Sequence, residues 1–243
     1  MTGLTKAFRV EVNIDASADT VWRALTVPGR IQEWFGWEYE GLTEEVAYLF
    51  ADHADPQPPD RVGLPGGQEI CLIGARGHTT VRVTTTDILP DADTGTGTDT
   101  GTGPVTGTET RDKGKDRFDE VEEGWRVFLQ QLRFLLERHP EAGRRRTLRL
   151  TGRATGSGLL AALEPAEAKE VWHESRFAHL VVDREDHLLA ALAERPLTEV
   201  GLGPVSLTVT AYGLDAEGFA ELRRRWTTRW EDAVDEPGPA IPG

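Results

Sequence analysis

Hydrophobic residues recur at helical spacing along one stretch of the chain, from Asp116 to Arg138. Its apolar side chains follow one another at steps of three and four residues: Phe118, Val121, Trp125, Phe128, Leu132 and Leu135. This spacing predicts an amphipathic helix with one wide apolar face. Asp116 suits the N-cap, and Arg138 and His139 end the segment before Pro140. A helix of this length spans roughly 34 Å, enough to cover a small sheet.

Shorter patterns before this helix predict strands and short helices. Apolar and polar residues alternate from Phe8 to Asp15, which indicates a strand with one buried face. Ser17 suits the N-cap of a helix over 18–27, and a second short helix follows over 30–35. The other expectations here are a strand opening at Trp37 and Tyr39, an apolar run over 46–50, a loop over 52–67, and strands over 69–73 and 79–88.

The segment directly before the long helix differs in composition from the rest of the chain. Residues 91–115 contain the run TGTGTDTGTG and almost no apolar side chains. Such a segment cannot bury enough surface to offset its chain entropy, so we expect a disordered insertion. The functional alternative is a regulatory loop over a pocket, with threonines as modification sites.

After the long helix the same kinds of pattern return. We expect strands over 147–151 and 205–211, a short helix over 158–163, and a hairpin formed by 177–183 and 187–193. Asp215 suits the cap of a final helix whose apolar face carries Phe219, Leu222, Trp226 and Trp230. Both halves thus end with alternating strands and a capped, tryptophan-bearing helix. This order suggests an internal duplication with a shortened second copy.

We therefore expect a first domain over 1–140, a second α+β half over 145–235 and a flexible tail over 236–243. The chain has 243 residues, 27 Lys plus Arg against 41 Asp plus Glu, and a net charge of −14. This acidic balance argues against nucleic-acid partners and anionic membranes. Cys71 is the single cysteine, which excludes an internal disulfide. With no apolar run of transmembrane length and no signal-peptide pattern, the expectation is a cytoplasmic protein.

The N-terminal part carries an ordered set of motifs. They are the run V-W-x-A-L-T, a proline break, a W-F pair and a later G-W pair: Val21, Trp22, Ala24, Leu25, Thr26, Pro28, Trp34, Phe35, Gly124 and Trp125. Over roughly residues 8–138 this order resembles the START-like (SRPBCC) superfamily, and within it the homologues of the heat-shock-protein ATPase activator C-terminal domain. The chain departs from the family in its loop-rich middle, in the Thr/Gly insertion and in everything after about residue 145.

The resemblance implies an α+β helix-grip fold, in which a curved antiparallel sheet wraps round the long C-terminal helix and a cavity lies between them. Family members bind hydrophobic small molecules, and some are cyclases. The sequence has seven Trp residues, and aromatic walls suit an apolar pocket. The simpler alternative is that these rings fill the core. The expected cavity lining is Trp22, Trp34, Phe35, Gly124, Trp125, Phe128 and Leu132.

Candidate catalytic and metal-binding residues are few. Asp52, His53 and Asp55 lie close together, but a solvated loop explains them better than a metal site. The best candidates for acid–base chemistry are Glu120, Glu123 and Arg126, near the inward stripe of the long helix. His173, His179 and His187 have no nucleophile beside a base, and the arginines at 144–149 and 223–229 are expected to balance nearby acids.

Three hypotheses of function follow. The first is a non-catalytic START-like module that binds a hydrophobic small molecule, with no cofactor and no metal. The second is an interaction protein that acts on a chaperone ATPase, and the third is a cyclase-type enzyme. Because fold-level resemblance does not carry function, the site itself has to decide between them.

Overall fold

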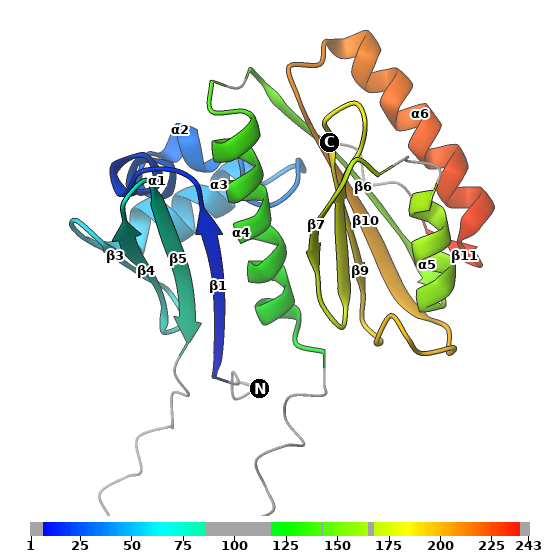
Figure 1. Cartoon of the computed structure of the whole chain (residues 1–243), viewed down its shortest axis with the longest axis horizontal. Coiled ribbons are helices and arrows are strands. Elements are labelled where there is room, and N and C mark those ends of the chain that lie inside the picture. The colour runs from blue at the N-terminus through cyan, green and yellow to red at the C-terminus, as the bar shows by residue number, and fades with distance from the viewer. Residues whose placement is uncertain (1–6, 86–117, 142, 165–167, 239–243) are drawn as a thin grey trace, which may run out of the picture.

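The computed structural model describes residues 7–85, 118–141, 143–164 and 168–238. Two antiparallel sheets stand on either side of the long helix α4 (Glu120–Arg138), as Figure 1 shows. Helices α5 (Gly156–Leu163) and α6 (Ala216–Ala233) cover the outer face of the second sheet. In the described ranges no helix is long and apolar enough to cross a membrane.

The first sheet belongs to the N-terminal half. Its strands are β1 (Phe8–Ile14), β2 (Asp55–Gln57), β3 (Arg61–Leu64), β4 (Gln68–Ala75) and β5 (His78–Thr85), in the spatial order β1-β5-β4-β3-β2. The alternation in β1 buries every second side chain, and Val10 pairs with Val83 of β5. The expected strands over 8–15, 69–73 and 79–88 therefore form within the described residues, whereas residues 91–115 lie outside them.

Two expectations for the N-terminal half are wrong. The segment 52–67 is not all loop, because it contains β2 and β3; β3 offers only two buried apolar positions, too few for a clear period. No strand opens at Trp37. The positive φ angles of Gly36 (64°) and Gly41 (108°) break the extended chain there.

Short helices connect β1 to β2. Helix α1 (Ala18–Thr26) begins as expected after Ser17, whose side chain accepts a hydrogen bond from the backbone N–H of Thr20. It is followed by α2 (Pro28–Ile31), α3 (Leu42–Ala47) and the π-helix η1 (Tyr48–Asp52). Their apolar side chains pack with the first sheet and one flank of α4 into a single core.

Helix α4 is buried on two sides rather than one. Its N-cap is Asp119, whose Oδ1 accepts from the N–H groups of Val121 and Glu122, so the expected cap at Asp116 is wrong. Leu132 packs in the core with the first sheet, while Phe134 packs against the second sheet. The one apolar stripe predicted from the sequence accounts for the contacts with the first core but not for those of Val127 and Phe134 with the second sheet.

The second sheet forms the opposite wall. Its strands are β6 (Arg145–Ala154), β7 (Glu170–Glu174), β8 (Ala178–Val182), β9 (Leu188–Ala193), β10 (Gly203–Tyr212) and β11 (Glu236–Pro237), in the order β11-β6-β10-β9-β8-β7. The expected hairpin, the strand over 205–211 and the Asp215-capped helix are all present. Strand β7 was not expected, and β11 shows that the predicted flexible tail is wrong for residues 236–237.

The α+β class, the antiparallel pairing and a long helix packed on the sheet are thus confirmed by the elements themselves. Each half runs strand, short helix, antiparallel strands and long helix in the described residues. That this shared order reflects a duplication, with domains over 1–140 and 145–235, stays a prediction.

Candidate functional site

A cleft of about 490 Å³ opens beside the N-terminal half of α4. One side is built by α4, the connection after α2 and the β3–β4 end of the first sheet, and the other by β6, β9 and β10 of the second sheet. Its lining includes Phe35, Trp37, Leu64, Gln68, Gly124, Trp125, Phe128, Arg149, Thr151, Ser206 and Thr208. The cleft therefore borders both sheets, whereas the resemblance implied a cavity between α4 and the first sheet.

Aromatic rings form the wall on the side of the first half. The ring centroid of Phe35 lies 4.7 Å from that of Phe128 and 6.2 Å from that of Trp125. The Trp125 indole N–H donates a hydrogen bond to the side-chain oxygen of Gln68, which fixes the ring. Tilted aromatic contacts at these separations stabilise one another, so this wall is preorganised.

The second half holds this aromatic wall in place. The Tyr212 hydroxyl donates to the backbone oxygen of Glu33 at 2.7 Å, and Arg145 Nη2 donates to that of Phe35 at 2.8 Å. Oriented with its nitrogen toward the connection, the Gln131 side chain donates to the backbone of Trp34 at 2.7 Å. Hydrogen bonds from β6, β10 and α4 thus hold the connection between α2 and α3 (residues 32–41) in place.

Polar side chains of β6 and β10 form part of the opposite wall, beside the apolar Ala190, Leu192, Pro204 and Val205, because these strands have two different faces. Their residues Leu148, Leu150, Leu207 and Val209 pack into the core under α5 and α6. The alternate residues of the same strands line the cleft: Arg149, Thr151, Ser206 and Thr208. Since successive side chains of a strand point to opposite faces, the sequence of these strands dictates a dry side and a polar side.

Arg149 is the cation in this polar wall. Its guanidinium carbon lies 3.8 Å from the ring centroid of Trp37, and its Nη1 donates to Thr208 Oγ1 at 3.4 Å. Burial lowers the pKa of Arg149 from its ordinary value, and the charge of Glu120 opposes this shift. The cleft therefore brings together apolar rings, hydroxyl groups and one partly desolvated positive charge, and its lining also includes the carboxylates of Glu45, Glu120 and Glu194.

The expected lining residues divide into two groups. Phe35, Gly124, Trp125 and Phe128 line the cleft. Trp34 and Leu132 lie elsewhere, with 0% exposure in the first core, and Trp22 packs against that core half-buried. The assignment of all seven residues to ligand binding stays a prediction, since their positions alone do not test it.

Sequence reasoning missed Trp37, Arg149 and Thr208. The alternation of polar and apolar residues in 147–151 and 205–211 was the available signal, because a buried strand with hydroxyl groups on one side must face something polar. The candidates for acid–base chemistry are not brought together in the cleft. Glu120 lines the cleft, whereas Glu123 is buried and pairs with Arg126 at 3.2 Å.

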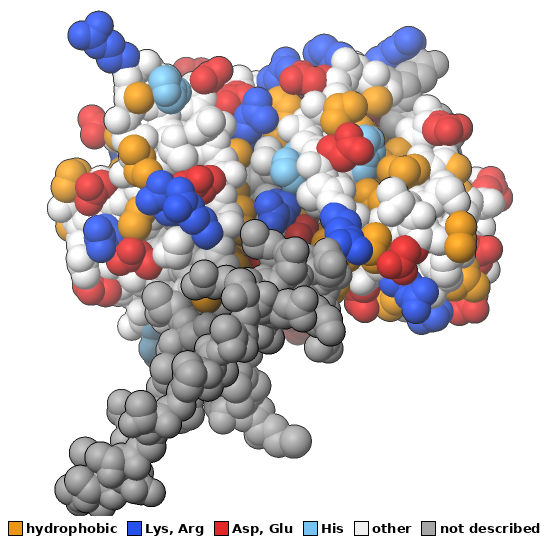
Figure 2. Space-filling view, turned by 60° about the horizontal axis from the view of Figure 1, so that its bottom comes forward, with side chains coloured by type: hydrophobic (Ala, Val, Ile, Leu, Met, Phe, Trp, Pro, Cys, Tyr) orange, Lys and Arg blue, Asp and Glu red, His pale blue; other side chains and the backbone are white. Residues whose placement is uncertain are grey.

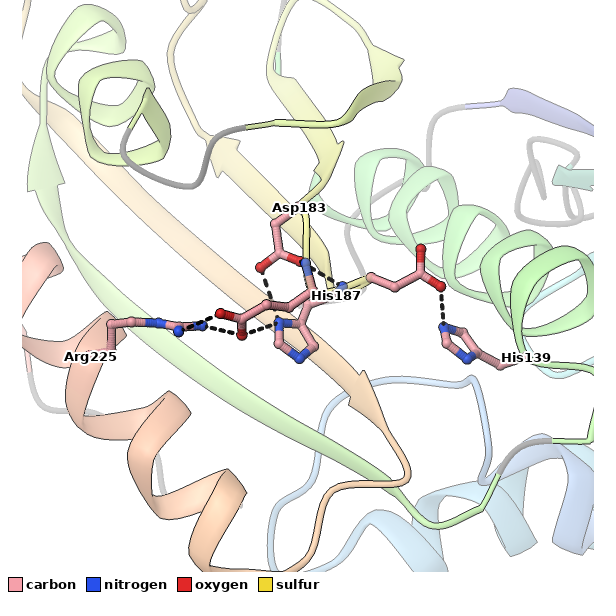
Figure 3. Close-up of polar contacts among 6 residues, drawn as sticks. His139, Asp183, His187 and Arg225 are labelled. Atoms are coloured by element: carbon pink, nitrogen blue, oxygen red, sulfur yellow. Dashed lines mark hydrogen bonds and ion pairs between the residues drawn. The ribbon is translucent and has the colours of Figure 1, made fainter.

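The β8–β9 turn carries a compact group of possible metal ligands: Asp183, Glu185 and His187 (Figure 3). The Asp183 side chain contacts His187 Nδ1 at 3.0 Å, and both Glu185 oxygens accept from Arg225 at 2.7 Å. Burial would raise the pKa of Asp183, but hydrogen bonds from His187 outweigh it and the pKa is lowered. A cation here would have to displace Arg225, so we interpret the group as a link between the turn and α6.

A second, wider groove of about 740 Å³ lies beside α2 and α3. Charged side chains of both signs line it, and Glu38 pairs with Arg146 at 3.4 Å at its edge. Its charges neutralise one another, so the apolar cleft is the better candidate site. The face shown in Figure 2 likewise has Lys and Arg side chains interspersed with acidic ones rather than gathered into one patch.

No family model and no curated protein matches the chain. Among solved structures, DynU16, "a putative protein in the dynemicin biosynthetic locus", is 18% identical, covers 93% of this chain and 96% of its own, and has a TM-score of 0.32. The di-domain ARO/CYC BexL from the BE-7585A biosynthetic pathway is 11% identical over 94% of this chain and 95% of its own, with a TM-score of 0.33.

The Aha1 dimer from Colwellia psychrerythraea is also similar, with 19% identity over 55% of this chain and 97% of its own, and a TM-score of 0.33. The matches thus include the kinds of protein that the sequence resembles. At these TM-scores and identities they carry no argument about function, which has to rest on the cleft.

Proposed function

We propose that this protein binds a hydrophobic small molecule in the cleft between α4 and the second sheet, without catalysing a reaction on it. The observation that carries the proposal is the pair of unlike walls facing one space of about 490 Å³. Pockets for small ligands have this size and this mixture of apolar lining with a few polar groups.

The cleft stands out against dense packing elsewhere on the same helix. Leu129, Leu132 and Leu135 have 0% exposure, so the rest of α4 is closed by neighbouring side chains. At Gly124 a Cβ atom would meet only Phe128 Cε2, at 3.9 Å. No sheet side chain among the described residues lies within 4 Å of that Cβ position, which leaves room for a ligand beside the backbone.

Binding is proposed without a reaction because the charged groups of the lining do not form a catalytic arrangement. Glu45 already accepts a hydrogen bond from the Tyr39 hydroxyl, and Glu120 and Glu194 lie on separate elements. A cyclase would need an acid or base held beside its substrate by a neighbouring group.

The test is a fluorescence titration with the uncharged apolar probe N-phenyl-1-naphthylamine, supported by a thermal-shift measurement. We expect saturable binding to the wild type and its loss in Gly124→Trp, whose indole would occupy the cleft. The matched control is Gly29→Trp, since Gly29 is exposed and a Cβ there meets nothing within 4 Å. Undiminished binding to a folded Gly124→Trp variant would show that the probe does not occupy the cleft.

A further inference from the structure

We propose that Arg149 forms an anion subsite in the cleft, so that the ligand is an apolar molecule carrying an acidic group such as a carboxylate or sulfonate. This inference rests on the proposed binding function and specifies the chemistry of its ligand. The supporting observation is that the arginines near α4 and the second sheet differ in whether they pair with a carboxylate.

Arg149 lacks the carboxylate partner that two other arginines of its strand have. On the same strand, Arg146 pairs with Glu38 at 3.4 Å and Arg153 pairs with Glu236 at 3.4 Å. In the described part of the chain no carboxylate oxygen lies within 4.0 Å of the Arg149 nitrogens, although Glu120 attracts it from farther away. A partly buried cation without a counter-ion is costly, which favours an anion brought by the ligand.

The position of the guanidinium suits this role. Its guanidinium lies over the Trp37 ring in a cation–π contact, and one of its five N–H groups donates to Thr208 among the described residues. Arg145 differs from Arg149, because its Nε and Nη1 are buried without partners among the described residues and it does not line the cleft. The nitrogen atoms of Arg149 are not sealed in this way, and the residue lines the cleft.

Hydroxyl groups complete the subsite. Thr208 lies opposite Arg149 in the β6–β10 register, and Ser206 lies opposite Thr151 on the same face. A guanidinium beside hydroxyl donors can hold a carboxylate or a sulfonate by charge-assisted hydrogen bonds. The aromatic wall is across the cleft, so the anion and the apolar body of one molecule would contact different walls.

The test compares two probes that differ by one group: uncharged N-phenyl-1-naphthylamine and its sulfonated counterpart 1-anilinonaphthalene-8-sulfonate. Arg149→Met removes the charge and keeps an apolar side chain of similar length. We expect it to weaken sulfonate binding about tenfold or more, and to change binding of the uncharged probe less than about twofold. The matched control Arg153→Met, on the same strand but outside the cleft lining, should change neither.

The outcomes separate this inference from the proposed function. If Arg149→Met binds the sulfonate as well as the wild type does while both probes still bind, the anion subsite is wrong and the binding function stands. If the wild type binds neither probe, both are wrong. Arg149→Gln, which removes the charge but keeps a polar side chain, repeats the measurement should the methionine variant not fold.

Discussion

The two sides of α4 show how one helix can close a core and open a binding cleft. Toward the first sheet, Leu129, Leu132 and Leu135 are fully buried among apolar side chains. Toward the second sheet, Phe134 fills the contact at the C-terminal end, but Gly124 and Phe128 border the cleft near the N-terminal end. Stability and ligand binding therefore depend on different residues of the same element.

The facing strands explain the difference. Interior positions of the first sheet are valines such as Val12 and Val81, which exclude water and draw α4 close. The cleft-facing positions of β6 and β10 include Thr, Ser and Arg side chains, whose polar groups lose hydration on burial and therefore contribute less than valine to collapse onto the helix. An open space persists where apolar rings face hydroxyl groups.

The largest expected effect comes from removing α4 from the second sheet. A fragment of residues 143–238 would expose the apolar face formed by Trp172, Leu180 and Leu188, which α4 covers through Phe134. We expect no cooperative thermal melt by circular dichroism and poorly dispersed amide resonances. Co-expression with residues 1–142 should restore both.

A sharp melting transition for the isolated fragment would contradict this. It would show that the second half is an autonomous domain. Its contact with α4 would then form the cleft without being needed for folding of the second half.

Local periodicity was sufficient to predict much of the fold. Strand β1, helix α1 with its Ser17 cap and helix α6 with its Asp215 cap each satisfy a period and a cap within one short segment. Such elements depend on neighbours in sequence, so the sequence displays them directly.

The cleft could not be predicted from local periodicity, because the residues of its walls are far apart in sequence and meet only in the folded chain. Phe35 and Arg149 lie on separate elements, and the backbone of Phe35 is held by Arg145 from the second half. The burial of α4 on two sides was also hidden, since Gln130 and Gln131 read as a polar face yet are buried. Of the expected lining residues that line the cleft, Trp125 and Phe128 also lie on the helical stripe that the periodicity predicts.

Two tryptophans three residues apart allow a direct comparison of the stability that a core position and a cleft position contribute. Trp34 has 0% exposure and donates through Nε1 to the Ala24 oxygen at 2.9 Å, so Trp34→Ala should lower the free energy of unfolding by about 3–5 kcal/mol. Trp37 is half-buried in the cleft lining, and Trp37→Ala should lower it by about 1–2 kcal/mol. Urea denaturation measures both, and equal losses would place Trp37 in the closed core.

The smallest effect concerns Gly124 and has the opposite sign. Glycine in a helix interior destabilises the folded state relative to alanine by about 1 kcal/mol or less. The new Cβ would lie in ordinary contact with Phe128, at 3.9 Å, so Gly124→Ala should raise the free energy of unfolding by about 0.5–1 kcal/mol. The small methyl group should leave binding of the uncharged probe nearly unchanged.

Gly156 provides the matched control, because it is also a helical glycine but its Cβ would clash with the Leu197 backbone oxygen. Gly156→Ala should therefore destabilise the protein under the same urea titration. The opposite signs follow from the space around each glycine: protein backbone crowds Gly156, and Gly124 borders the cleft. A loss of stability in Gly124→Ala would mean that the protein itself fills the space beside α4, and no room for a ligand would remain at that point.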